Sequence, residues 1–284
     1  MIEFHDVSKT FAGRPAASHL NLNFAEGAFS VLIGTSGSGK STTLKMINRL
    51  VEHDSGVIRF AGEEIRSLPV LELRRRMGYA IQSIGLFPHW TVAQNIATVL
   101  QLEKWSRTKI ADRVDELMAL LGLEPALRDR YPHQLSGGQQ QRVGVARALA
   151  ANPQVLLMDE PFGALDPVTR GALQAEMTRI HRILGRTIVL VTHDIDEALR
   201  LADHLVLMDH GEVVQQGSPL KLLTWPKNDF VREFFGRSEL GVRLLSLRAR
   251  QCEVLPVSDS RGTPCGTLHF RDLLAGEVTR ECTA

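Results

Sequence analysis

The sequence GTSGSGKS at residues 34–41 lies between the apolar run Phe29–Ile33 and the segment Thr42–Leu50, whose composition favours a helix. Its glycines permit a tight turn in which successive backbone N–H groups point into one concavity. The helix that follows adds the positive end of its dipole, so the pattern predicts a phosphate-binding loop between a strand and a helix. A Gly/Ser-rich surface turn is the alternative, and the strand and helix patterns on either side argue against it.

Two residues at the end of this stretch carry side chains suited to nucleotide chemistry. Lys40 would reach the β- and γ-phosphates of a nucleotide as a point charge. The Ser41 hydroxyl would help to coordinate a Mg²⁺ ion that keeps most of its water ligands. The sequence therefore predicts a site for a nucleoside triphosphate with Mg²⁺.

The overall composition places few limits on function. A chain of 284 residues is long enough for one large domain or two smaller ones. The formal net charge of +1 gives no general electrostatic argument for nucleic acid, an anionic membrane or an acidic partner. The cysteines Cys252, Cys265 and Cys282 are odd in number and lack metal-ligand spacing, which favours a reducing compartment over a disulfide framework.

The N-terminal segment MIEFHDVSKTF alternates apolar and polar residues and contains acidic ones, so we expect an edge strand rather than a secretion signal. Nowhere does the sequence contain the ~18 consecutive apolar residues needed to span a bilayer. Any role at a membrane would therefore require a partner protein.

We expect short strands at Ile2–Val7, Leu20–Phe24 and Phe29–Ile33, followed by another at Gly56–Phe60. Phe11 lies in a turn between the first two. An exposed aromatic ring ahead of a phosphate-binding loop could stack on a purine base, and packing at the edge of the core is the alternative.

Residues 83–134 are predominantly helical by the spacing of their apolar residues, with helices expected at Val92–Leu102 and Lys109–Leu121. Gly122 suits the C-terminal end of the second helix. The stretch Ile84–Trp90 is unusually apolar for a loop, so it either packs into this helical insertion or provides a docking surface.

A second possible anion-binding helix start occurs at LSGGQQQR, residues 135–142. A serine followed by two glycines opens the helix expected at Gln139–Ala150, which again directs N–H groups and a helix dipole outward. One nucleotide in one protomer would not obviously use both starts. Two protomers arranged head to tail could each offer one start to each nucleotide.

The apolar run Val155–Glu160 ends in two acidic residues, as expected of a buried parallel strand that delivers carboxylates to the carboxyl edge of a sheet. Because side chains alternate along a strand, we expect Asp159 and Glu160 to face different ways. One carboxylate would bind Mg²⁺ through water, and the other would act as a general base toward an attacking water. A solvated strand end is the alternative.

Further polar residues lie near the ends of predicted elements. Asp166 suits the N-cap of the helix expected at Val168–Leu184. His193 follows the apolar strand Thr187–Thr192 about one strand–helix–strand unit after the acidic pair, which would bring it to the same sheet edge near the γ-phosphate. Gln82 follows another β-type run and is a candidate metal or water ligand.

Toward the C-terminus we expect an edge hairpin formed by Leu205–Met208 and Val213–Gln216. From Ser218 onward the alternation of strands and helices stops. Residues 252–275 fit a strand, a turn, a second strand and a short helix, which are too few to bury a core alone.

Together these residues resemble the ATP-binding cassette (ABC) ATPases over residues 1–235, with every motif in the family's order. The motifs are Walker A GTSGSGKS at 34–41, the Q-loop residue Gln82, the signature LSGGQ at 135–139, Walker B VLLMDE at 155–160, the D-loop Ala164–Asp166 and the switch histidine His193. The resemblance implies an α/β P-loop NTPase cassette with a RecA-like core, an antiparallel β-subdomain and a helical subdomain at about residues 83–150.

The resemblance also implies roles for individual residues. Catalytic roles fall to Glu160, His193 and Gln82, with Glu160 as the general base, and metal coordination to Ser41, Gln82 and Asp159. The residues expected to contact ATP, bound with Mg²⁺, are Phe11, Gly34, Thr35, Ser36, Gly37, Ser38, Gly39, Lys40, Ser41, Thr42, Ser136, Gly137, Gly138, Gln139 and Asp166. Of these, Ser136 to Gly138 would close on ATP bound by the opposite protomer.

Within this family the sequence is similar to the ATP-binding subunits of bacterial importers for osmoprotectants such as glycine betaine, choline and related quaternary amines. The similarity lies in IGTSGSGKSTTLKMINRLVEHDSG, GYAIQSIGLFPHWTVAQNI and DEPFGALDPVTR. It implies an ATPase that forms a homodimer, docks on two transmembrane permease subunits near Ile84–Trp90 and works with a periplasmic or lipid-anchored substrate-binding protein. The expected location is the cytoplasmic face of the inner membrane, and no nucleic acid is expected as a partner.

The C-terminal tail, residues 236–284, carries a second resemblance. The segments Cys252–Val257, Gly266–Leu268 and Asp272–Leu274 are similar to the second half of a cystathionine-β-synthase (CBS) module. The first half of such a module is missing after about Arg250, which weakens the case for nucleotide or ionic-strength sensing by the tail.

Other functions compete with this interpretation. The cassette could energise import of another small solute, such as an amino acid, a polyamine or an oxyanion, although such subunits commonly carry a different tail. A soluble cassette acting on nucleic acid or ribosomes would usually contain tandem cassettes or a long coiled-coil insertion, and neither is present in the sequence. A small-molecule kinase would leave the LSGGQ helix start without a role.

Overall fold

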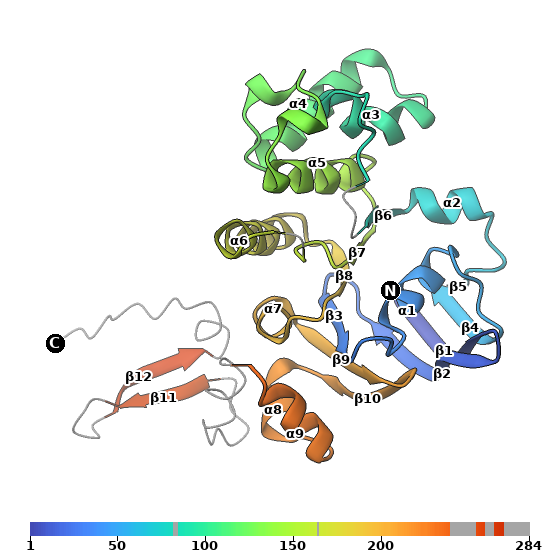
Figure 1. Cartoon of the computed structure of the whole chain (residues 1–284), viewed down its shortest axis with the longest axis vertical. Coiled ribbons are helices and arrows are strands. Elements are labelled where there is room, and N and C mark those ends of the chain that lie inside the picture. Colours follow the sequence, from blue (N-terminus) through green and yellow to red (C-terminus); the bar gives the residue numbers. More distant parts are fainter. Residues whose placement is uncertain (82–84, 164, 239–253, 259–263, 270–284) are drawn as a thin grey trace.

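The computed structural model describes residues 1–81, 85–163, 165–238, 254–258 and 264–269 (Figure 1). Its centre is a six-stranded sheet in the order β10-β9-β3-β8-β7-β6. All neighbouring strands are parallel except β10, which pairs antiparallel with β9 at the edge. The strands are β3 (Phe29–Gly34), β6 (Met77–Ala80), β7 (Val155–Asp159), β8 (Thr187–Val191), β9 (His204–Asp209) and β10 (Glu212–Gly217).

Alternating side chains of the central strands enter two hydrophobic clusters, one on each face of this sheet. In β7, Leu156 and Met158 belong to one cluster, and Val155 and Leu157 belong to the other. All four side chains are buried. A strand that is buried on both faces has a continuous apolar sequence, which explains the run of apolar residues there.

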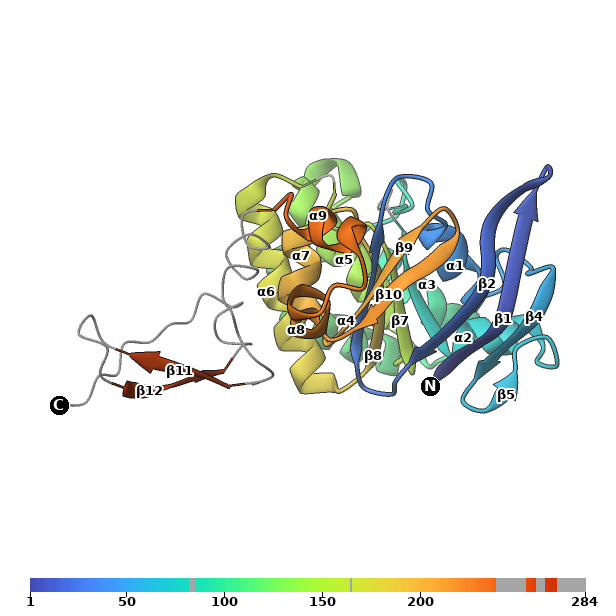
Figure 2. The same cartoon turned by 90° about the horizontal axis from the view of Figure 1, so that it is seen from below.

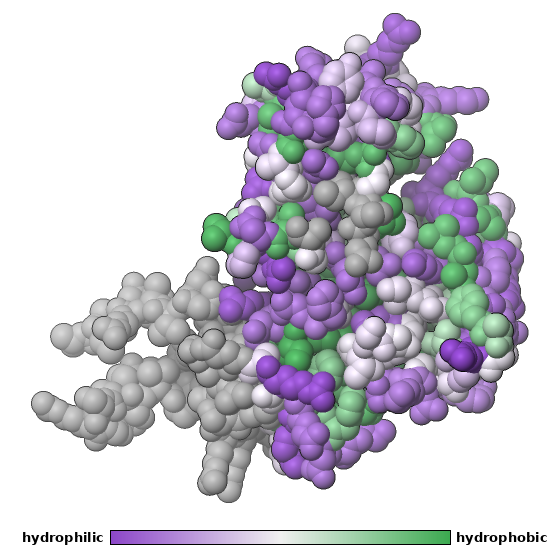
Figure 3. Space-filling model, viewed as in Figure 1, coloured by the Kyte–Doolittle hydropathy of each residue, from purple (hydrophilic) through white to green (hydrophobic). Residues whose placement is uncertain are grey.

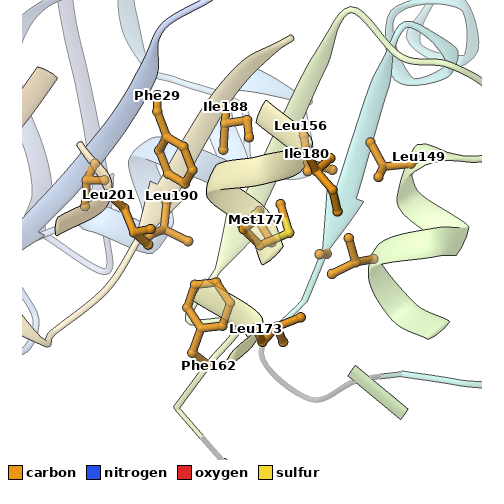
Figure 4. Packing of buried hydrophobic residues seen from close by; sticks show 14 of the residues in the cluster. Phe29, Leu149, Leu156, Phe162, Leu173, Met177, Ile180, Ile188, Leu190 and Leu201 are labelled. Atoms are coloured by element: carbon orange, nitrogen blue, oxygen red, sulfur yellow. The ribbon is translucent and has the colours of Figure 1, made fainter. Parts of the chain in front are cut away.

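Helices cover both faces of the sheet (Figure 2). The helices α6 (Pro167–Leu184) and α7 (Ile195–Leu201) lie on one face, where Met177 of α6 packs among the strand residues Ile188 and Leu190 (Figure 4). The helix α1 (Lys40–Ile47) belongs to the cluster on the opposite face.

A four-stranded antiparallel sheet, in the order β2-β1-β4-β5, lies beyond α1 (Figure 2). Its strands are β1 (Ile2–Phe11), β2 (Arg14–Phe24), β4 (Ser55–Phe60) and β5 (Glu63–Glu64). Its buried residues share one cluster with α1, so the two sheets enclose this helix. The sheet is the antiparallel part expected of the fold.

A helical region projects from the edge of the six-stranded sheet (Figure 1). It contains α3 (Val92–Leu102), α4 (Arg107–Leu120), α5 (Gly137–Leu149) and the short 3₁₀ helices η1 (Pro125–Leu127) and η2 (Pro132–Gln134). The helix α5 contacts α3 and α4 on one side and β6 and α6 on the other, so it joins this region to the sheet. The short helix α2 (Val70–Arg75) precedes β6.

Some expected boundaries are displaced for identifiable reasons. The first strand continues past Val7 to Phe11, so Phe11 ends a strand instead of lying in a turn. The helix α1 stops at Ile47, and Arg49 then adopts a left-handed backbone conformation (φ 54°) that cannot continue a helix. Serine caps move the starts of α4 and α5 two residues earlier than expected, to residues 107 and 137.

The helices α8 (Pro219–Thr224) and α9 (Asp229–Phe235) follow the edge hairpin. The strands β11 (Val254–Ser258) and β12 (Pro264–His269) form a separate antiparallel pair, as expected for strand, turn and strand, whereas the expected final helix lies outside the described residues. The CBS-like assignment stays a prediction.

The described surface in Figure 3 is mostly hydrophilic, with hydrophobic residues in small groups. Within the described part of the chain, none of the helices has the length and apolar character that crossing a bilayer requires.

Candidate active site

The loop between β3 and α1 is held in place by hydrogen bonds of its own. The N–H of Ser38 donates to the carbonyl of Thr35 (3.2 Å), and the Thr35 hydroxyl donates to Asp209 at 2.5 Å. Gly39 adopts a φ of 95°, and a Cβ at this position would lie 2.1 Å from the carbonyl oxygen of Ala16. Glycine is therefore required here both by the conformation and by the close approach of β2.

Lys40 is the first residue of α1, and its ammonium group turns back into the loop. Its Nζ donates hydrogen bonds to the backbone carbonyls of Gly34 (3.0 Å) and Thr35 (2.7 Å). Burial lowers the pKa of Lys40, while the nearby charges of Glu160 and Asp159 raise it. The ammonium group of Lys40 is therefore close enough to the carboxylates of Glu160 and Asp159 to interact with both electrostatically.

The Asp159 carboxylate lies next to the start of α1 and has three donors around it. Ser41 Oγ donates to Asp159 Oδ1 at 2.8 Å, and Lys45 Nζ lies 3.6 Å from Oδ2. The Tyr79 hydroxyl also bonds to this carboxylate, and burial followed by the Asp159 charge raises the pKa of Tyr79. Asp159 is itself buried, so these neighbours fix the direction of its carboxylate.

The pairing of Ser41 with Asp159 also allows a test of the expected metal. Mg²⁺ takes oxygen ligands and is usually bound through one or two carboxylates together with phosphates and water. The described residues contain no group of three or more His, Cys, Asp or Glu side chains that could hold a metal ion. The Ser41 hydroxyl and the Asp159 carboxylate are oxygen ligands of the kind that Mg²⁺ takes, so they fit a Mg²⁺ ion whose other ligands would be phosphate and water.

Glu160 and His193 meet at the carboxyl edge of the same sheet, as the sequence predicted. His193 Nδ1 lies 3.3 Å from Glu160 Oε2, and a Cβ on Gly163 would lie 3.9 Å from that oxygen and from His193 Cε1. The Glu160 side chain is 21% exposed and the His193 side chain 66% exposed, so the pair opens toward solvent.

The prediction that alternation along the strand separates the directions of Asp159 and Glu160 is wrong. The strand β7 ends at Asp159, and Glu160 adopts a left-handed conformation (φ 46°) rather than the next position of a pleated strand. The turn, and not strand alternation, therefore sets the direction of Glu160. Such a conformation is unfavourable for a residue with a Cβ.

Asp166 is the N-cap of α6, as predicted. Its Oδ1 accepts hydrogen bonds from the N–H groups of Val168 and Thr169, both at 3.1 Å. A hydrogen bond from the Thr169 side chain is the largest cause of the lowered pKa of Asp166. The carboxylate is therefore kept ionised at the start of this helix.

The LSGGQ segment begins α5 with a complete capping box. Ser136 Oγ accepts from the N–H of Gln139 (3.3 Å), and the Gln139 side chain accepts from the N–H of Ser136 (2.9 Å). A Cβ on Gly138 would lie 2.4 Å from Thr169 Cγ2, so this glycine allows α5 to approach α6 closely. No hydrogen bond joins residues 136–139 to residues 34–42 among the described parts of the chain.

Two other predicted site residues have different outcomes. Phe11 is 47% exposed with Lys9 Nζ 5.2 Å from its ring centroid, so it does not pack in the core. Gln82, the predicted metal or water ligand, lies outside the described residues, as does Ile84 at the start of the apolar loop.

The remainder of the apolar loop exposes two aromatic rings over a buried amide. Phe87 and Trp90 are 44% and 37% exposed, and their ring centroids lie 4.5 Å apart. Asn95 is fully buried beneath them: its Oδ1 accepts from Phe87 N (2.8 Å), and its Nδ2 donates to the carbonyls of Phe87, Trp90 and Thr91. Arg147 of α5 donates to the carbonyl of Gly85. The loop is thus anchored from α3 and α5 while its rings face outward.

Sequence reasoning missed Lys45 and Tyr79 as neighbours of Asp159. Lys45 lies four residues after Ser41 on α1, so helical spacing could have placed both on one face. Tyr79 reaches Asp159 because β6 and β7 are adjacent parallel strands, which no local pattern reveals.

Comparisons with known proteins identify the family of the chain. Residues 17–163 match the family described as ABC transporter. The glycine betaine uptake system ATP-binding protein YehX of Escherichia coli (strain K12) is 77% identical over 305 positions that cover 96% of this chain and 99% of that protein. The glycine betaine/carnitine/choline transport ATP-binding protein OpuCA of Bacillus subtilis (strain 168) is 53% identical over 241 residues, which cover 84% of this chain and 63% of that protein.

A solved structure shares the fold of most of the chain. It is the dimeric post-hydrolysis state of the ATP-binding cassette MJ0796 bound to ADP and Pi, with 33% identity and a TM-score of 0.69, covering 77% of this chain and 99% of that one. The chain therefore belongs to the ABC transporter family. Within it, the chain is an ATP-binding cassette with the P-loop fold and is an ATPase of that family. The alignment with YehX is longer than the chain of 284 residues, so that relative contains residues with no counterpart here.

Proposed function

We propose that this chain is the ATP-hydrolysing subunit of an importer for glycine betaine or related quaternary amines. The observation that carries the proposal is the meeting of Lys40, the Ser41–Asp159 pair and the Glu160–His193 pair at one edge of the sheet. The solute is proposed from the 77% identity with YehX, whose name specifies glycine betaine uptake.

The residues at this edge suit the attack of water on the γ-phosphate. Such a reaction depends on positioning and on neutralising negative charge more than on covalent help from the protein. Glu160 would accept a proton from the water as general base. His193 would orient the Glu160 carboxylate beside the γ-phosphate. The ammonium group of Lys40 would neutralise charge on the phosphates, aided by the N–H groups of residues 34–42.

The metal and adenine contacts follow from the same arrangement. Ser41 and Asp159 would hold Mg²⁺, which when bound supplies charge neutralisation at the phosphates. Gln82 stays a proposed further ligand. Phe11, exposed at the tip of the β1–β2 hairpin, would stack on the adenine ring.

The signature residues are proposed to act on the nucleotide of a second copy of the chain. In support, the described residues 136–139 form no hydrogen bond with the phosphate loop of their own chain, and the related cassette bound to ADP and Pi is dimeric. Asp166 would lie in the same interface. Closure of two copies on two ATP molecules would supply the movement for transport, and hydrolysis would reverse it.

The exposed rings of Phe87 and Trp90 are proposed to dock on a permease subunit, together with Ile84. Two permeases and a periplasmic or lipid-anchored substrate-binding protein would complete the importer, and the cassettes would lie on the cytoplasmic face of the inner membrane. The anchoring of this loop by Asn95 supports the assignment, because a fixed loop loses little conformational entropy on docking.

The experiment combines hydrolysis and uptake. The purified chain and its Glu160→Gln variant are assayed for ATPase activity, and both are expressed with candidate permease and binding subunits in cells that lack other importers for labelled glycine betaine and choline. Glu160→Gln should bind ATP and hydrolyse it about 10²- to 10⁴-fold more slowly, the range expected on loss of a general base.

Glu212→Gln, which changes an exposed glutamate on β10, is the matched control and should behave as wild type. Normal turnover by Glu160→Gln would contradict the general-base assignment. Hydrolysis that depends on Glu160 without uptake of either solute would retain the ATPase and reject the proposed solutes.

A further inference from the structure

One guanidinium group joins two segments of the proposed active site. Arg170 lies near the start of α6, and its Nη2 donates to the carbonyl of Leu165 at 3.1 Å. Its Nη1 donates to Asp194 Oδ2 at 3.3 Å. Leu165 belongs to the D-loop and Asp194 directly follows His193, so this single side chain spans from one segment to the other.

Asp194 divides its two carboxylate oxygens between two tasks. Its Oδ1 accepts from the N–H of Glu197 (3.0 Å) as the N-cap of α7, while Oδ2 faces Arg170. The N–H of Asp194 donates to the Thr192 hydroxyl at 3.0 Å. The backbone on both sides of His193 is therefore held by Asp194, and Arg170 connects it to α6.

A second acidic residue, Glu197, lies near Arg170. Glu197 is 4% exposed, and Gln174 Nε2 of α6 donates to its Oε2 at 3.3 Å. Burial, followed by the charge of Asp194, raises the pKa of Glu197 to about 8. The charge of Arg170 lowers the pKa of Glu197 to a smaller extent, whereas the carboxylate oxygen within bonding distance of Arg170 belongs to Asp194.

The segment tied by Arg170 is in contact with the proposed catalytic pair. The N–H of Gly163 donates to the carbonyl of Glu160, and a Cβ at Gly163 would lie 3.9 Å from Glu160 Oε2 and from His193 Cε1. Leu165 follows two residues later, so we expect a shift of the D-loop to disturb the hydrogen bond between Gly163 and Glu160.

We propose that Arg170 is a positioning residue for ATP hydrolysis, which keeps the D-loop and His193 in a fixed relation through Leu165 and Asp194. The inference rests on the proposed function of the Glu160–His193 pair. Among the described residues, the hydrogen bonds of Arg170 go to Leu165 and Asp194 and not to residues 34–42, so its loss should slow hydrolysis without weakening ATP binding. A displacement of about 1 Å in an active site can reduce the rate by about a hundredfold.

The test uses four single variants and one double variant of the full chain. Arg170→Met removes both donors, and Arg170→Lys keeps one charge that can reach only one acceptor at a time. Asp194→Asn retains an N-cap residue but removes the charge that pairs with Arg170. Arg182→Met changes an exposed arginine on the same helix and is the control. The readouts are kcat and KM for ATP, equilibrium binding of a fluorescent ATP analogue, and Tm.

Arg170→Met and Asp194→Asn should each lower kcat by about ten- to a hundredfold with KM and analogue affinity within about twofold of wild type. Arg170→Lys should recover part of the rate. The double variant, Arg170→Met with Asp194→Asn, should be no slower than the slower of its two single variants, because both changes break the same interaction between Arg170 and Asp194. Wild type and Arg182→Met should be equal.

Three results would overturn the inference: a kcat for Arg170→Met within twofold of wild type, losses that multiply in the double variant, or losses that merely follow a lowered Tm. Each of these leaves the proposed function intact as long as wild type hydrolyses ATP and Glu160→Gln does not. Absence of hydrolysis by the wild-type chain would overturn both.

Discussion

The helices α1 and α5 both begin at segments rich in glycine and serine, but their first turns are satisfied in different ways. The N-cap of α1, Gly39, has a left-handed conformation and no side-chain hydrogen bond, whereas Ser136 and Gln139 close the start of α5 with a reciprocal capping box. The Lys40 ammonium group also lies in the first loop.

The difference separates two kinds of anion-binding helix start. No side chain caps the start of α1, and its loop is shaped by close contact with β2, so this start suits an acceptor supplied by a ligand. The start of α5 is capped by its own side chains without any ligand, which agrees with the proposal that it acts on a nucleotide only when a second protomer approaches.

Lys40→Met should have the largest effect. It removes the only ammonium group that is bonded to the loop among the described residues, so ATPase activity should fall by about 10²- to 10³-fold, as for loss of a charge-stabilising donor. Steady-state hydrolysis measures it, with Lys109→Met on the exposed side of α4 as control. Unchanged ATPase activity in Lys40→Met would contradict the assignment of the α1 start as the phosphate-binding one.

Ser136→Asp should separate the capping role of α5 from its nucleotide role. Aspartate caps helices as well as serine, so Tm should stay within about 1 °C, but the added negative charge should oppose an approaching phosphate and lower ATPase activity by at least about tenfold. Ser136→Ala should instead cost about 1 kcal/mol of stability. Full ATPase activity in Ser136→Asp would argue that this helix start meets no phosphate.

Gly138→Ala should destabilise the contact of α5 with α6. The new Cβ would lie 2.4 Å from Thr169 Cγ2, and overpacking of this kind typically costs about 1–3 kcal/mol. Thr169→Ser removes the methyl group, so the double variant should regain most of the lost stability in thermal unfolding. Failure of Thr169→Ser to restore Tm would place the strain elsewhere.

Glu197→Gln should have an effect on stability that depends on pH. The pKa of about 8 in the folded chain lies above the ordinary value of 4.5, so the native state retains a proton that the unfolded state releases between these values. Stability of the wild type therefore falls as pH rises from about 4.5 to 8, and glutamine, which stays neutral, should remove that contribution.

Tm of Glu197→Gln should exceed that of wild type by about 2 °C or more at pH 8.5, and by less at pH 5. Glu124→Gln, an exposed change, should show no such dependence. A Tm difference that is the same at both pH values would contradict the raised pKa.

Much of the fold and of the site could be predicted because the relevant interactions are local. The phosphate loop, the caps formed by Ser136 and Asp166, and the apolar strand ending at Asp159 each depend on residues close in sequence. The meeting of Glu160 with His193 was predictable from the rule that parallel strands present their carboxyl ends at one edge.

The remainder depends on tertiary structure. Tyr79 reaches Asp159 across neighbouring strands, and Arg170 joins Leu165 to Asp194 from a separate helix. The left-handed turn at Glu160 is unfavourable for its residue type, so propensity predicts against it. Such features arise from the packing of the whole chain and leave no local signature.

The buried amide of Asn95 has a mechanical consequence. Because this one side chain of α3 is bonded to the backbone at Phe87, Trp90 and Thr91, the loop cannot slide along the helix that carries it. If the helical region rotates, Phe87 and Trp90 should therefore move with α3 as one rigid unit. The loop would transmit such a movement directly instead of absorbing it by changing its own conformation.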